Sequence, residues 1–110
     1  MQPVENSSAL EKLVQQAPIV VVEIGSVRCC ACSAIAGKLS AYCAGKDDLA
    51  YASLSLEAAA DTCADLGIYS APAVLVFVHG RLTIREAGVM SIEAIIQRIE
   101  RYRALMKEDA

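Results

Sequence analysis

The sequence has no long apolar run and no basic stripe. Its apolar stretches fall well short of the roughly 20 residues that span a bilayer, and its first residues lack the basic and apolar regions of a secretion signal. Acidic and basic residues are interspersed and the net charge is only −3, so no surface is expected to neutralise a run of phosphates. We therefore expect no membrane and no nucleic acid partner, and the default location is the cytoplasm.

The composition is also not that of a disordered chain. Hydrophobic residues make up 55% of the sequence and charged residues 21%, whereas a disordered chain has low hydrophobicity and high charge. A length of 110 residues suits one compact domain and leaves no room for a second. We expect a single domain over residues 1–110.

The cysteines are few, odd in number and unevenly spread. There are five, and three of them crowd into Cys29, Cys30 and Cys32. A secreted scaffold held by disulfides would have an even number at wider spacing. This distribution favours reactive thiols over structural cross-links.

The first elements can be read from local signals. Ser8 and Glu11 form a capping-box pattern, and apolar residues at helical spacing then predict a helix that starts near Ser7 and ends before Ala17-Pro18. Residues 19–24 are a continuous β-branched run with one acidic interruption, typical of a central strand buried on both faces.

The later pattern predicts parallel crossovers followed by a hairpin. The predicted elements are a helix from the cysteines to near Gly45, a strand over 49–56, a helix over 58–66 closed by Gly67, strands over 73–78 and 82–86 with a turn between them, and a last helix capped by Ser91. A short edge strand before residue 7 is also possible. This order predicts an α/β fold with a mixed sheet covered by helices on both faces.

Cys29 and Cys32 have the spacing of a redox pair at the start of a helix. Two cysteines separated by two residues can meet the distance requirement of a disulfide. The helix start presents unpaired amides and the positive end of the helix dipole, which favour the Cys29 thiolate, and Arg28 adds to this effect. The hypothesis is that Cys29 attacks a partner disulfide and that Cys32 resolves the mixed disulfide.

Glu23 is a carboxylate in an apolar strand. Burial there should raise its pKa and let it accept the Cys32 proton near neutral pH, which makes it a candidate proton relay. The alternative is that Glu23 lies at a strand edge, where it would be solvated and inert.

Three separated motifs resemble the thioredoxin family, and the resemblance runs from Asn6 to about Met106. They are the strand Val20-Val21-Val22-Glu23-Ile24, the active-site motif Cys29-Cys30-Ala31-Cys32, and the segment Gly67-Ile68-Tyr69-Ser70-Ala71-Pro72. The resemblance implies a thioredoxin-like fold with a central mixed sheet of four to five strands and helices on both faces. It also implies a protein disulfide oxidoreductase that needs no cofactor and works with protein disulfide substrates and an unidentified reductase or thiol donor.

The same resemblance suggests the substrate-binding residues. Pro72 should be cis and face the cysteines, and the backbone before it should pair with an extended substrate segment. Gly80 resembles the family's hairpin glycine and Gly88 the glycine of the substrate groove. The candidate substrate-binding residues are Arg28, Cys30, Ala31, Ala71, Pro72 and Gly88.

The active-site motif departs from the usual family pattern. Gly25 and Arg28 stand where the family has tryptophans, Cys30-Ala31 replaces Gly-Pro, and Ser53 replaces a lysine that neighbours the buried acid. Loss of that lysine would raise the pKa of Glu23 further. A potential more oxidising than the usual value of about −270 mV is expected.

Other residues leave alternatives open. Cys30 could intercept the mixed disulfide, accept glutathione, or be a tolerated surface substitution. We expect Cys43 and Cys63 to be packing residues, His79 to be solvated and far from the cysteines, and Tyr69 to touch substrate.

Two other functions compete with disulfide exchange. One is a soft-metal or iron–sulfur module that uses Cys29, Cys30 and Cys32, although no fourth ligand is evident. The other is a non-catalytic adaptor that binds partners near Pro72.

Overall fold

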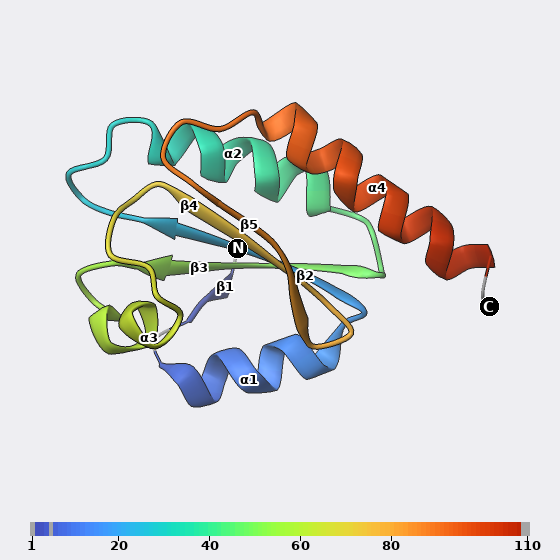
Figure 1. The fold of residues 1–110 in the computed structure, drawn as a ribbon, viewed down its shortest axis with the longest axis horizontal. Coiled ribbons are helices and arrows are strands. Elements are labelled where there is room, and N and C mark those ends of the chain that lie inside the picture. Colours follow the sequence, from blue (N-terminus) through green and yellow to red (C-terminus); the bar gives the residue numbers. More distant parts are fainter. Residues whose placement is uncertain (1, 5, 109–110) are drawn as a thin grey trace.

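The computed structural model describes residues 2–4 and 6–108, whose strands form one twisted sheet (Figure 1). The strands are β1 (Gln2–Pro3), β2 (Ile19–Gly25), β3 (Leu49–Ser55), β4 (Ala73–Val78) and β5 (Arg81–Ala87). Their order across the sheet is β1-β3-β2-β4-β5. β1 and β2 run parallel to β3, whereas β4 is antiparallel to both β2 and β5. The predicted mixed sheet and the short strand at its edge are both confirmed.

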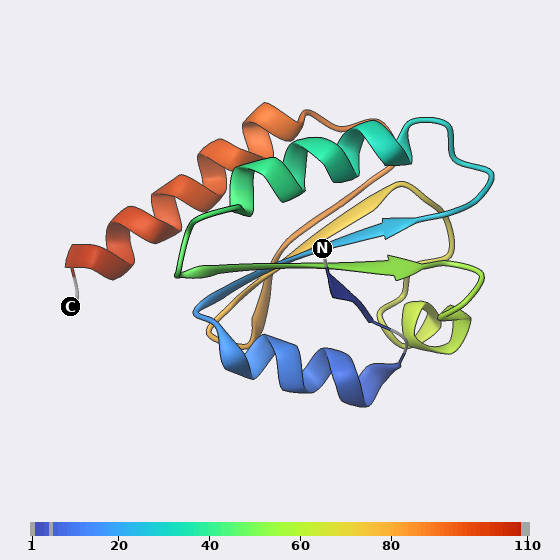
Figure 2. The same ribbon diagram turned by 180° about the vertical axis from the view of Figure 1, so that it is seen from behind.

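Helices cover both faces of this sheet. α2 (Cys32–Cys43) and α4 (Ile92–Glu108) lie on one face, and α1 (Ser7–Gln16) and α3 (Ala60–Asp65) lie on the other (Figure 1, Figure 2). One apolar cluster fills the layer under α1 and α3, and a second, which includes Leu39 and Ile99, fills the layer under α2 and α4. No helix within the described residues is both long enough and apolar enough to cross a membrane.

β2 is the central strand, as its β-branched sequence predicts. β3 pairs with it on one side and β4 on the other, so every residue from Ile19 to Ile24 is buried. A strand that is covered on both faces must be apolar throughout, because neither set of alternate side chains reaches water. Glu23 is the one charged residue in this run.

The capping residue of α4 agrees with the sequence prediction, and that of α1 does not. Ser91 caps α4, since its Oγ accepts a hydrogen bond from the Ala94 amide at 3.2 Å. The predicted capping box of Ser8 and Glu11 is wrong: Asn6 caps α1, and its Oδ1 accepts from the Ala9 amide at 2.8 Å. Asparagine is as good a cap as serine, so the capping residue lies two positions earlier than the Ser8 pattern suggests, whereas α1 itself begins at Ser7, as predicted.

Candidate active site

The site lies where β2 ends. The chain leaves β2 at Gly25, passes through a loop over residues 26–31 and enters α2 at Cys32. The segments before β4 and after β5 lie at the same end of the sheet, on the left of Figure 1. Because β4 runs antiparallel to β2, its amino end lies beside the carboxyl end of β2, which is why motifs far apart in the sequence meet here.

Cys29 and Cys32 are joined by a disulfide, and their Cα atoms lie 5.5 Å apart. The two residues differ in exposure: Cys29 is half-buried in the loop, whereas Cys32 begins α2 and is only 7% exposed. Cys30 is a free and exposed cysteine between them. Of this pair, Cys29 is the sulfur that an incoming partner can reach, and Cys32 is shielded behind it.

Hydrogen bonds fix the loop that carries Cys29. The Cys29 amide donates to the Ser26 carbonyl at 3.1 Å. The Ser26 hydroxyl donates to Glu57 Oε2 at 2.5 Å, and the Val27 amide donates to Glu57 Oε1 at 3.3 Å. These bonds, led by that from Ser26, hold the pKa of Glu57 below its ordinary value. The Arg28 amide donates to the Ser26 hydroxyl at 3.2 Å.

Sequence reasoning missed Glu57. It follows the end of β3, and β3 runs parallel to β2, so the residues after both strands come out at one edge of the sheet. That parallel pairing was predicted, and it would have pointed to an acid directly after the second strand as a partner for the active-site loop.

Glu23 is buried beneath the cysteine pair. Its side chain is 4% exposed, and desolvation by burial raises its pKa from 4.5 to about 7. The alternative of a solvated residue at a strand edge is therefore wrong. A Cβ atom on Gly25 would lie 3.0 Å from Glu23 Oε2 and 3.5 Å from Cys32 Cβ, so the carboxyl and Cys32 border the same small space.

The neighbours of Glu23 are neutral. Ser53 pairs with it across β2 and β3, as the missing lysine of the family pattern implied. Tyr51 precedes Ser53 by two residues and is also buried, and its pKa is raised by burial and by the charge on Glu23. No sequence motif singles out Tyr51.

An apolar groove lies beside the cysteine pair. It has a volume of about 500 Å³ and is lined by Ala31, Ala34, Ile35, Lys38, Pro72, Gly88, Val89, Met90, Ile92 and Glu93. Three of the predicted substrate-binding residues therefore meet here: Ala31, Pro72 and Gly88. The peptide bond between Ala71 and Pro72 is cis, as predicted, and the Gly88 amide donates to the Pro72 carbonyl at 2.9 Å.

The remaining predicted residues lie outside this groove. Arg28 and Cys30 are exposed on the loop, and Val27 beside Arg28 is 87% exposed. Tyr69, before the cis proline, is 77% exposed. None of these side chains is part of the wall of the groove.

The other cysteines and the histidine lie away from the site. Cys43 and Cys63 are buried, as expected of packing residues, and burial raises the pKa of Cys43 to about 11. His79 is exposed at the opposite end of β2, where its amide donates to the Pro18 carbonyl at 2.8 Å.

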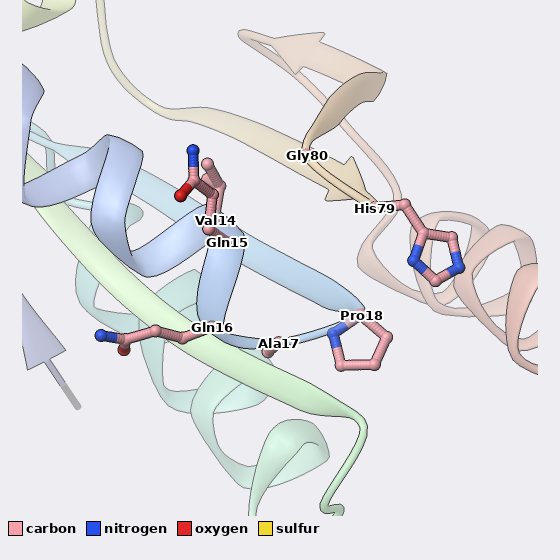
Figure 3. A pocket seen from close by; sticks show the side chains of 7 residues that line it. All are labelled: Val14, Gln15, Gln16, Ala17, Pro18, His79 and Gly80. Atoms are coloured by element: carbon pink, nitrogen blue, oxygen red, sulfur yellow. The ribbon is translucent and has the colours of Figure 1, made fainter.

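A second pocket, of about 430 Å³, lies at that opposite end. It is lined by Val14, Gln15, Gln16, Ala17, Pro18, His79 and Gly80. The side chains of Gln15, Gln16 and His79 point in different directions and do not converge on one point (Figure 3). In the described part of the chain, no cluster of three or more cysteine, histidine or acidic residues could hold a metal ion.

Comparisons with known proteins agree with this arrangement. The thioredoxin family model matches residues 2–101. Thioredoxin from Fasciola hepatica has a similar solved structure, with a TM-score of 0.81 and 20% identity over 92% of this chain and 98% of that one. Mitochondrial thioredoxin 3 from Saccharomyces cerevisiae, in its oxidized form, has a TM-score of 0.81 and 15% identity over 92% and 94% of the two chains.

Thioredoxin from Plasmodium falciparum has a TM-score of 0.80 and 19% identity over 93% of this chain and 99% of that one. No curated protein sequence matches the chain significantly. Identities this low establish the fold alone, but the family model spans nearly the whole chain and includes the cysteine pair. A redox oxidoreductase role in general follows from that match, and the chain belongs to the thioredoxin family.

Proposed function

We propose that this protein is a thiol–disulfide oxidoreductase that exchanges the Cys29–Cys32 disulfide or dithiol with protein substrates. The observation that carries the proposal is the pair itself: a half-buried Cys29 bonded to a buried Cys32, with the Glu23 carboxyl beneath. A pair of this kind has one sulfur that a partner can reach and one that is kept for the second step.

In the first step the Cys29 thiolate attacks one sulfur of a substrate disulfide. A mixed disulfide between Cys29 and the substrate forms, and the other substrate sulfur leaves as a thiolate. The start of α2 favours the anionic form of Cys29, because unpaired amides and the helix dipole are positive there.

In the second step Cys32 passes its proton to the Glu23 carboxylate, and its thiolate attacks the Cys29 sulfur. The Cys29–Cys32 disulfide forms and the substrate's second sulfur leaves as a thiolate, so two electrons have moved to the substrate. A pKa of about 7 suits Glu23 to this transfer, because the group changes charge near neutral pH. An unidentified reductase or thiol donor then returns two electrons.

Substrate binding involves the groove and the loop around Cys29. Ala31, Pro72 and Gly88 line the groove, and the backbone of Ala71, just before the cis proline, would pair with an extended substrate segment. Arg28 and Cys30 face the partner from the loop. We also infer a cytoplasmic location, because the free thiols Cys30, Cys43 and Cys63 suit a reducing compartment.

The test is single-turnover reduction of a small disulfide-linked protein, such as insulin, by the fully reduced chain. Cys29→Ser should abolish reduction. Cys32→Ser should instead accumulate a stable mixed disulfide through Cys29, which mass spectrometry identifies. Cys63→Ala is the matched control, since it removes a buried thiol on the opposite face of the sheet and should leave the rate unchanged.

Two outcomes would contradict the proposal. If the wild type reduces no disulfide and Cys29→Ser keeps every partner interaction, the chain is an adaptor. If the reduced protein binds Cu(I) or Zn tightly and stoichiometrically through its cysteines, simple exchange is not its function.

A further inference from the structure

Two buried side-chain oxygens lack a hydrogen-bond partner within the described residues: Glu23 Oε2 and the Tyr51 hydroxyl. Both side chains are more than nine-tenths buried, Tyr51 being 9% exposed. An unpaired buried polar atom opposes folding, so each such atom in a folded protein calls for a specific explanation. Here one of the two belongs to the proposed proton relay.

The two groups share one face of the sheet. Val21 pairs with Tyr51 and Glu23 pairs with Ser53 across β2 and β3. Because Val21 and Glu23 are two residues apart on β2, the side chains of Tyr51 and Glu23 are diagonal neighbours on the face that α2 covers. Burial raises the pKa of Tyr51, and the charge on Glu23 adds to this shift, in keeping with their places on one face of the sheet.

The described residues that are placed beside Glu23 include Cys32 from α2, Ser53 from β3 and Val74 from β4, and none of these three is cationic. Burial raises the pKa of Glu23. A charged Glu23 carboxylate would therefore be stabilised here by hydrogen bonds from neutral groups, and the buried Tyr51 hydroxyl is one such group.

We propose that Tyr51 is a positioning residue for disulfide exchange, whose hydroxyl supports the Glu23 carboxylate through one internal water molecule. This inference rests on the proposed function, in which Glu23 accepts the Cys32 proton. A phenol can donate while Glu23 is charged and accept once Glu23 is protonated, so it serves both states of the relay. A water molecule with polar partners on two sides is a common way to satisfy buried oxygens.

The test compares Tyr51→Phe with Tyr102→Phe. The first substitution removes only the hydroxyl near Glu23, and the second removes a hydroxyl elsewhere in the same apolar layer, which makes it a matched control. Two quantities are measured on the reduced protein: the pKa of Glu23, from the carbon-13 shift of its carboxyl, and the pH dependence of single-turnover oxidation by oxidised glutathione.

Loss of the hydroxyl should raise the Glu23 pKa by about one unit, a tenfold change in its proton affinity. At pH values below the raised pKa of Glu23, less of this group is charged and able to accept the Cys32 proton, so the resolving step should be roughly three- to tenfold slower. The slowing is partly offset because the remaining carboxylate is a stronger base. The difference should close at higher pH. Tyr102→Phe should shift neither quantity.

An unchanged Glu23 pKa and an unchanged pH profile in Tyr51→Phe would overturn the inference, because a residue that only fills space would behave in that way. Glu23→Gln separates this failure from failure of the relay itself. If Glu23→Gln slows resolution while Tyr51→Phe shifts nothing, Tyr51 alone is excluded. If Glu23→Gln leaves the rate and its pH dependence unchanged, the relay role fails and the inference falls with it.

Discussion

Replacing Glu23 with glutamine should remove a destabilisation of the folded protein that grows with pH. The carboxyl has an ordinary pKa of 4.5, and burial raises it to about 7 in the fold. Between these values the unfolded chain releases a proton that the folded protein retains. Stability therefore falls as pH rises through this window, and the loss is complete above the folded pKa.

The size of the effect follows from the shift. One pKa unit corresponds to about 1.4 kcal/mol, so the full shift from 4.5 to about 7 amounts to roughly 3 kcal/mol. Between about pH 5 and about pH 8 the wild type should lose roughly 2 to 3 kcal/mol of folding stability that Glu23→Gln does not lose. That loss is a large fraction of the roughly 5–15 kcal/mol by which small proteins are stable.

The assay is urea unfolding of the oxidised protein at several pH values, followed by circular dichroism. Keeping the Cys29–Cys32 disulfide intact prevents Cys32 from titrating, so the difference between wild type and variant reports Glu23. Shifts of other groups affect both proteins alike and cancel. Parallel pH profiles for the two proteins would refute the reasoning, because they would mean that Glu23 has the same pKa folded and unfolded.

Three further predictions follow from other contacts. Ser26→Ala removes the hydroxyl that donates to Glu57 and accepts from the Arg28 amide, so hydrogen exchange at that amide should speed up about fivefold; unchanged exchange would show that the loop does not depend on this bond. Arg103→Met breaks a two-bond contact with Asp48, at 2.7 and 3.1 Å, and should cost about 1 kcal/mol in thermal or urea unfolding near neutral pH. Because Arg103 holds the pKa of Asp48 low, the stabilisation from this pair is present above the unfolded-state pKa of Asp48 and is lost as pH falls through its folded-state pKa. A stability difference between wild type and Arg103→Met that persists in strong acid would contradict this prediction. Cys30→Ser should leave the redox potential within about 10 mV of the wild type, as measured against glutathione buffers, and a larger change would give Cys30 a part in the exchange.

The sequence predicts those parts of the fold whose signals are local. A β-branched run at residues 19–24 is enough to indicate a central strand, and burial of Glu23 follows from its apolar neighbours. The cysteine spacing, together with the helical pattern after it, is likewise enough to indicate a redox pair at the start of a helix.

Several details that local patterns do not determine were not predicted. Asn6 and Ser8 are both residues that cap helices well, so the local pattern does not distinguish between them, and Asn6 is the cap that α1 uses. The contact of Glu57 with the active-site loop depends on strand register, and so does the place of Tyr51 near Glu23. A register shift by one residue would turn Tyr51 to the other face of the sheet, and local patterns do not determine the register to that accuracy.

The most direct test of the central claim is a redox titration of the purified protein against glutathione or dithiothreitol buffers, with mass spectrometry locating the disulfide at each point. We expect one reversible two-electron transition in which Cys29 and Cys32 form the pair, at a potential more oxidising than about −270 mV. Absence of a reversible pair, or a disulfide in which Cys30 replaces Cys29, would contradict the account.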